Sequence, residues 1–184
     1  MAGVGPEDLH ALAQEFLIAC EQALDTIPDF APGLGGAPAR SYISPGFPAA
    51  DCCDQLTVHV VALAEAPTEP AGLPSGLRAQ HGARVNHSSL SATILRCVPT
   101  GSTTKTRYVP PAAEEMEAAA RQLNADAWAL WNNVWNQIRA GQLFALCSGV
   151  FWGGMRSLEP SGGCGGWVMN LTVTTEGYEE NLGS

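Results

Sequence analysis

The chain has 184 residues, and nine basic against eighteen acidic residues give it a formal net charge of -9. This length is typical of one domain, which we place at 1–184, and it excludes two independent catalytic domains. An apolar share of 46% excludes global disorder, and the acidic charge argues against a surface whose main task is to hold nucleic acid. The sequence has no apolar run long enough to span a membrane, and its N-terminus lacks the basic region followed by an apolar region that is typical of a signal peptide. We therefore expect a soluble protein made and kept in a cytoplasm.

The first predicted element is an amphipathic helix. It begins at Pro6, and Glu7 and Asp8 follow where acids favour the positive end of a helix. Apolar residues then recur at helical spacing, at Leu9, Leu12, Ala13, Phe16, Leu17, Cys20, Leu24 and Ile27. Pro28 prevents continuation, and a loop of about a dozen residues follows to Pro38.

Three β-like runs come next, at residues 40–44, 55–63 and 89–98. The second alternates apolar and polar residues, which is typical of a half-buried strand. The third suits a hairpin partner for it, joined by the long loop 64–83. Since a loop of that length in so small a domain is commonly functional, we expect it to contact a partner.

The longest predicted element is a helix over 112–139, opened by Pro110 and Pro111 and stopped by Gly141. One apolar stripe runs along it, through Met116, Ala120, Leu123, Ala127, Leu130, Val134 and Ile138. A second stripe consists of Trp128, Trp131 and Trp135. We favour the interpretation that the tryptophans enter a deep core; contact with another subunit is the alternative.

Two further strands are predicted at 145–158 and 166–175, with a glycine-rich turn between them. The acidic end 176–184 is a second candidate contact segment. The order of elements predicts an α+β fold, in which an N-terminal helix and a long second helix pack on one face of a mostly antiparallel sheet.

The cysteines do not identify a chemistry, since none shows the paired spacing of a zinc site. Cys20 and Cys147 fall in apolar surroundings and are expected in the core. Cys52 or Cys53, Cys97 and Cys164 lie beside predicted strands and could meet, so a disulfide or a metal cluster stays open.

No local pattern marks a catalytic nucleophile, a phosphate loop or a paired-carboxylate site. His81 and His87 could bind a metal as a pair, but the sequence fixes no third ligand. The acids Glu114, Glu115 and Glu117 have a sufficient role in complementing the dipole of the long helix. The basic residues are dispersed, with one local excess near Lys105 and Arg107. We therefore expect no catalytic residue, no metal and no cofactor.

Four segments together suggest a family: Asp51–Val60, Ile94–Thr100, the helix start Pro110–Met116 and the turn Gly162–Trp167. They resemble small head-to-tail connection proteins of long-tailed actinobacteriophages, most closely the tail terminators. The similarity extends from about residue 8 to about residue 175. A terminator-like α+β fold agrees with the element order above.

The resemblance implies a structural virion protein of the neck, assembled in the host cytoplasm. Such a protein forms a homo-hexameric ring that caps the tail tube, ends tube polymerisation and joins the tail to the head connector. Its partners would be further copies of itself, the major tail tube protein and the head-to-tail stopper or connector. DNA would pass through the lumen without specific binding, and no membrane is implied.

A closed ring requires two different patches on each subunit. We expect them to come from exposed β edges and from the tryptophan-bearing helix, and an acidic lumen would resist sticking to DNA. The candidate interface residues are Trp128, Trp131, Trp135, Arg84, Lys105 and Arg107.

Three alternatives remain open. A head-completion stopper or adaptor of the same neck has a similar size. A small thiol- or metal-dependent enzyme would use Cys53, Cys97, Cys164 and a histidine. A general binding module would have no reason to form a closed ring.

Overall fold

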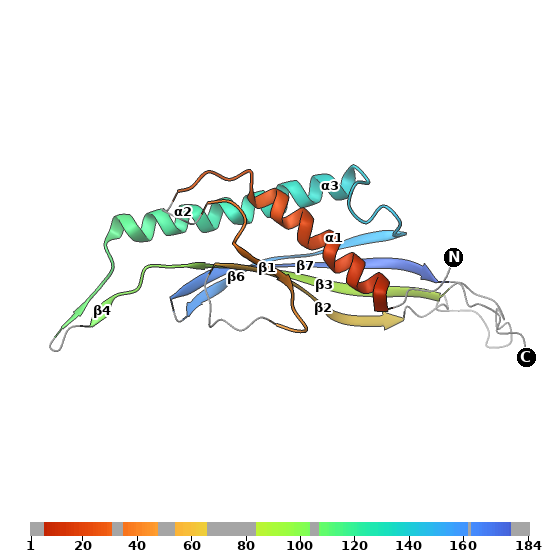
Figure 1. Ribbon diagram of the computed structural model, residues 1–184, viewed down its shortest axis with the longest axis horizontal. Helices are drawn as coiled ribbons and strands as arrows, with labels where there is room; N and C mark the ends of the chain where they lie inside the picture. The colour runs from red at the N-terminus through yellow and green to blue at the C-terminus, as the bar shows by residue number, and fades with distance from the viewer. Residues whose placement is uncertain are drawn as a thin grey trace, which may run out of the picture.

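In the computed structural model, residues 6–30, 35–47, 54–65, 84–103, 107–161 and 163–177 are described, with the backbone alone at 6, 7, 65, 84, 85, 176 and 177. Two layers make up the fold (Figure 1): a five-stranded sheet in the order β1-β2-β3-β7-β6, and helices over one of its faces. The strands are β1 (Arg40–Ile43), β2 (Gln55–Glu65), β3 (Arg84–Cys97), β6 (Gly149–Ser161) and β7 (Cys164–Gly177).

The sheet is antiparallel except where β1 pairs with β2 in parallel. Its longest pairing joins β3 and β7 over their full length, from Arg84 opposite Gly177 to Cys97 opposite Cys164. The helices are α1 (Pro6–Leu24), α2 (Ala113–Ala129), a π-helical turn η1 (Leu130–Val134) and α3 (Trp135–Arg139). The predicted α+β class, with helices on one face of a mostly antiparallel sheet, is confirmed.

Alternation along the strands decides which side chains meet the helices. Val58, Ala92, Met169 and Leu171 point from the central strands into the helix layer and are buried. Helix α1 presents Ala13, Phe16, Cys20 and Leu24 to them, each at most 1% exposed, and together with the apolar side of η1 they form one core. The predicted apolar face of the first helix is therefore confirmed, and so is that of the strand at 55–63 for Leu56 and Val58. It is wrong for Ala62, because a register shift after Val60 places this residue opposite Ser89, where it is exposed.

Several predicted boundaries are wrong in detail. The last hairpin starts later than expected, at Gly149, because residues 144–147 form a turn in which Phe144 has a φ of 59° and Phe144 O accepts the amide of Cys147. Its two strands then continue almost to the turn, at Ser161 and Cys164. Gly141 ends the long helix as predicted, in a conformation with a φ of 66° that favours glycine.

The first half of the predicted apolar stripe of the long helix is wrong. Met116 is 45% exposed and Ala120 is exposed as well. The buried residues of α2 are instead Ala119, Gln122, Asp126 and Ala129. The π turn adds a residue to the spacing, so that Leu130 and Val134 of the predicted stripe are buried, at 2% and 0% exposure. The cause is a polar partner beneath α2, described below.

A short hairpin that the sequence did not predict lies between β3 and α2. Strands β4 (Ser102–Thr103) and β5 (Tyr108–Val109) pair outside the main sheet and project beyond the start of α2, at the left of Figure 1. We call residues 102–103 and 107–109 the arm. All of them are exposed, with Tyr108 at 61% and Val109 at 44%.

The opposite sheet face carries small polar side chains. Ser89, Ser91, Asn170 and Thr172 lie in a shallow trough whose lining also includes Phe47, His59 and Arg156. None of the helices in the described part of the chain covers this face (Figure 1). No helix among the described residues has the length and apolarity needed to cross a bilayer.

Candidate assembly surface

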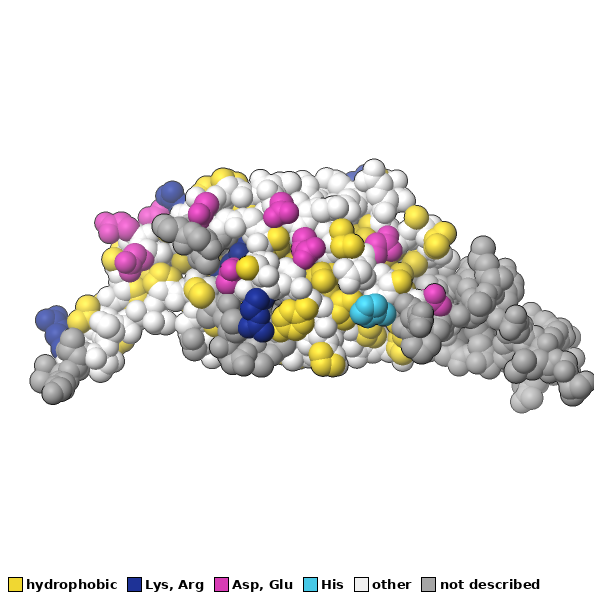
Figure 2. Space-filling model, in the orientation of Figure 1, with side chains coloured by type: hydrophobic (Ala, Val, Ile, Leu, Met, Phe, Trp, Pro, Cys, Tyr) yellow, Lys and Arg dark blue, Asp and Glu magenta, His cyan; other side chains and the backbone are white. Residues whose placement is uncertain are grey.

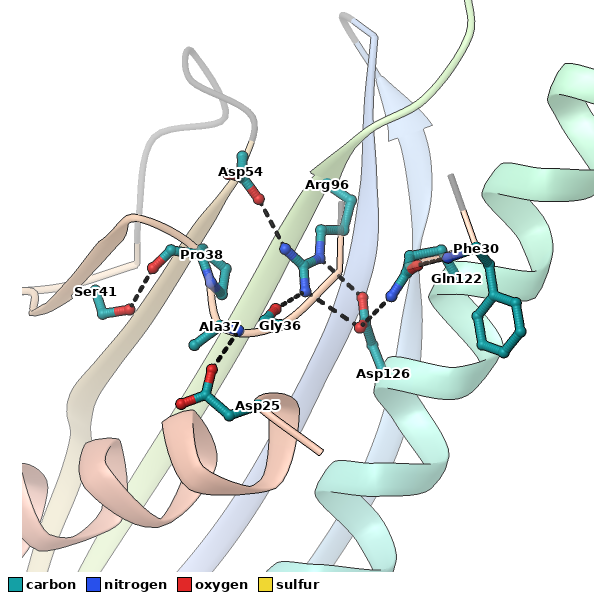
Figure 3. A network of polar contacts seen from close by, with 10 residues as sticks. All are labelled: Asp25, Phe30, Gly36, Ala37, Pro38, Ser41, Asp54, Arg96, Gln122 and Asp126. Carbon is teal, nitrogen blue, oxygen red and sulfur yellow. Dashed lines mark hydrogen bonds and ion pairs between the residues drawn. The ribbon is translucent and has the colours of Figure 1, made fainter. Parts of the chain in front are cut away.

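A buried charged cluster attaches α2 to the sheet (Figure 3). Arg96 of β3 is 1% exposed and points toward α2, where Asp126 is completely buried. Its Nε donates to Asp126 Oδ2 at 2.9 Å and its Nη2 to Asp126 Oδ1 at 3.2 Å. This two-point contact between guanidinium and carboxylate holds one helix position over one strand position.

The guanidinium group of Arg96 also binds two loops. Arg96 Nη1 donates to Asp54 at 2.8 Å and Nη2 to the carbonyl oxygen of Gly36 at 2.6 Å. Burial by itself lowers the pKa of Arg96, but the carboxylates of Asp126 and Asp54 outweigh burial and raise the pKa. The side chain therefore stays charged, and it joins α2, β3 and the segments before β1 and β2.

The same cluster positions the chain that leaves α1. Gln122 Nε2 donates to Asp126 at 3.2 Å, and Gln122 Oε1 accepts the backbone amide of Phe30 at 2.9 Å. Asp25 likewise accepts the amide of Ala37 at 3.0 Å. A continuous path of hydrogen bonds, drawn in Figure 3, therefore runs from Arg96 to Phe30.

Phe30 and Trp128 both line an apolar groove on the outside of the helix layer. We call it the aromatic groove; it has a volume of about 380 Å³ and is lined by Thr26, Ile27, Pro28, Phe30, Ala125, Trp128, Ala129, Asn132 and Asn133. Trp128 is 68% exposed and Phe30 45%. Two large aromatic side chains that line one groove are thus left to solvent, which is typical of a contact surface.

The three predicted tryptophans have different environments. Trp131 and Trp135 meet Trp152 of β6 edge to face, with ring centroids 4.6 Å and 5.7 Å apart. Trp152 in turn packs against the core. The core interpretation thus has support at Trp135, which is half-buried, but it is wrong for Trp128, whose ring lies outside the core.

The basic candidates lie at two places. Arg107 is exposed on the arm, next to Tyr108. Arg84 starts β3, opposite Gly177 at the far end of the sheet, so the structure does not bring it together with Arg107. Lys105, most of the contact loop 64–83 and most of the end 176–184 lie outside the described residues.

The cysteines only partly match expectation. Cys20 is buried in the core, and burial raises the pKa of its thiol. Cys147 is half-buried, and burial followed by the charge of Glu15 raises its pKa to about 11. Cys164 is disulfide-bonded, which agrees with the disulfide alternative for this residue. Both Cys52 and Cys53 lie outside the described residues.

Metal ligands do not gather in the described part of the chain, where no three His, Cys, Asp or Glu side chains could hold one ion. Of the histidine pair, His87 Nδ1 lies 3.1 Å from Thr174 Oγ1, and His81 is outside the described residues.

Sequence reasoning missed the charged cluster and the groove that it positions. A signal was present, because Gln122 and Asp126 are four residues apart on a helix and Arg96 interrupts an apolar strand. The sequence could not show that Gln122 and Asp126 of the helix face Arg96 of the strand.

A search against models of protein families finds no match, and a search of curated proteins finds none either.

Proposed function

We propose that this chain is a structural subunit of a phage neck, which forms a ring on the tail tube, ends tube polymerisation and joins the tail to the head connector. The proposal rests on the resemblance of four segments to tail terminators. The structural observation that favours it is a pair of unlike contact surfaces, the projecting arm and the aromatic groove.

Unlike surfaces matter because a closed ring is built head to tail. An interface with twofold symmetry uses the same patch on both subunits, whereas a ring needs one patch to meet a different one. The arm projects beyond the start of α2, and the groove lies between the end of α1 and the second half of α2. A hairpin of this size is marginally stable alone, which favours an arm that is covered on assembly.

The charge distribution is also suited to a channel for DNA. The formal net charge is -9, and Figure 2 shows acidic side chains spread over the helix layer. Such a surface does not retain a polyanion that passes it.

The test is electron microscopy of lysates from a phage with a nonsense mutation in this gene. Overlong, unattached tails beside DNA-filled heads are the expected result. Tails of normal length beside emptied heads would assign the protein to the stopper or adaptor position instead. Normal virions would overturn both assignments.

A further inference from the structure

We propose that the arm of one subunit inserts Tyr108 and Val109 into the aromatic groove of the next copy, and that this contact closes the ring. The inference rests on the proposed function for its ring, but it makes a separate claim about which surfaces meet.

The arm carries apolar side chains that the rest of the described chain does not cover. Tyr108 and Val109 are exposed, and the Tyr108 ring lies so close to Gly101 that any side chain there would collide with it. The glycine therefore lets the ring lie against the base of the arm. An exposed aromatic residue is well suited to anchor a protein interface.

The arm is unable to reach the groove of its own subunit. From the start of α2 at Ala113 to Trp128, a helix rises roughly 22 Å. The arm leaves the body in the opposite direction, beyond the start of the helix (Figure 1). An arm that fills the groove must then come from another copy, and repeating the contact generates a ring or a filament.

The two surfaces carry opposite charge. The described arm carries one basic side chain, Arg107, and no acid. The chain that forms α1 and the groove wall has no Lys or Arg before Arg40, and its acids are Glu7, Asp8, Glu15, Glu21, Asp25 and Asp29. Asp25 and Asp29, both exposed, bracket the lining segment 26–28. Such complementarity steers association and sets its orientation.

The groove is held open in advance of binding. Phe30 is fixed through its backbone by Gln122, and Gln122 by Asp126 and Arg96. Because the aromatic wall is already positioned, less conformational entropy is lost when the arm binds.

The first test places the photo-crosslinker p-benzoylphenylalanine at position 108 of the full chain. After illumination of assembled rings or tails, mass spectrometry should find the crosslink between two copies, on the peptide that contains Trp128 or on that with Phe30. Crosslinks confined to other peptides would overturn the inference.

The second test measures ring formation by mass photometry over a dilution series. Tyr108→Ser and Trp128→Ala should each raise the concentration for half-assembly by about tenfold or more. Phe151→Ser is the matched control: Phe151 is 59% exposed, close to the 61% of Tyr108, but lies on β6. Equal effects of all three substitutions would contradict the inference.

The outcomes separate this contact from the proposed function. Rings or capped tails that assemble through other residues would reject the arm contact and leave the neck assignment intact. A crosslink from position 108 to the groove, together with normal virions from the nonsense mutant, would support the contact and reject the neck assignment.

Discussion

The two halves of the long helix are attached to the sheet by different interactions. In α2 the buried face carries Asp126, which meets Arg96, and Gln122, which donates to Asp126. In η1 it carries Leu130 and Val134, which enter the core. Apolar attraction is non-directional, whereas a two-point ion pair defines one position. The polar half thus sets where the helix lies, and the apolar half contributes the burial of hydrophobic area.

The largest expected effect comes from removing the carboxylate of the polar half. Asp126→Ala should lower the free energy of unfolding by about 3–5 kcal/mol, because it leaves the Arg96 charge buried beside a cavity. Urea denaturation of the purified chain measures it. Asp54→Ala, at a partner that is 32% exposed, should cost clearly less. Equal losses of unfolding free energy in the two variants would show that Asp126 is no more important to Arg96 than Asp54 is.

The apolar half should respond by a different mechanism. Leu130→Ala removes a side chain that is 2% exposed and should cost about 3 kcal/mol through lost packing and a cavity. Met116→Ala, on the same predicted stripe but exposed, should change the free energy of unfolding by less than about 0.5 kcal/mol. A large loss at Met116 would contradict the shift in buried face at the π turn.

The link between cluster and groove can be weakened separately. Gln122→Ala leaves the Phe30 amide without its acceptor and should cost about 1–3 kcal/mol. Hydrogen exchange at the Phe30 amide should accelerate, while ring formation weakens because the groove wall is no longer fixed. Arg121→Ala, in an exposed pair with Glu117, serves as control and should leave both unchanged.

The smallest expected effect is on the pH dependence of stability, through the buried side chain of His59. His59 Nδ1 has no hydrogen-bond partner among the described residues, and burial lowers the pKa of His59 from its ordinary 6.5. As pH falls, His59 is protonated in the unfolded chain before it is protonated in the folded chain. The contribution of neutral, buried His59 to the free energy of unfolding is therefore present above about pH 6.5 and is lost below it. Thermal unfolding of the parent chain and of His59→Gln between pH 8 and pH 5.5 tests this. A pH dependence that is identical in both would reject it.

These contrasts explain why sequence patterns located the elements better than the surfaces. The strand at 55–63 and the helix around Phe16 were predictable because their apolar residues repeat with the period of the element. The buried face of α2 was not, since Gln122 and Asp126 count as surface residues until Arg96 is placed beneath them. The arm was missed because β4 and β5 have two residues each, too few to show a period.

The sequence by itself determined the class of fold, the positions of the first helix and of the strand at 55–63, and the limits of the long second helix. These depend on local periodicity and on Pro6, Pro28, Pro110 and Gly141. Only the tertiary structure decided that Arg96 lies under Asp126, that Trp128 faces solvent and that Phe30 lines the same groove. Contacts between distant segments depend on which faces the fold brings together, and a linear pattern does not contain that geometry.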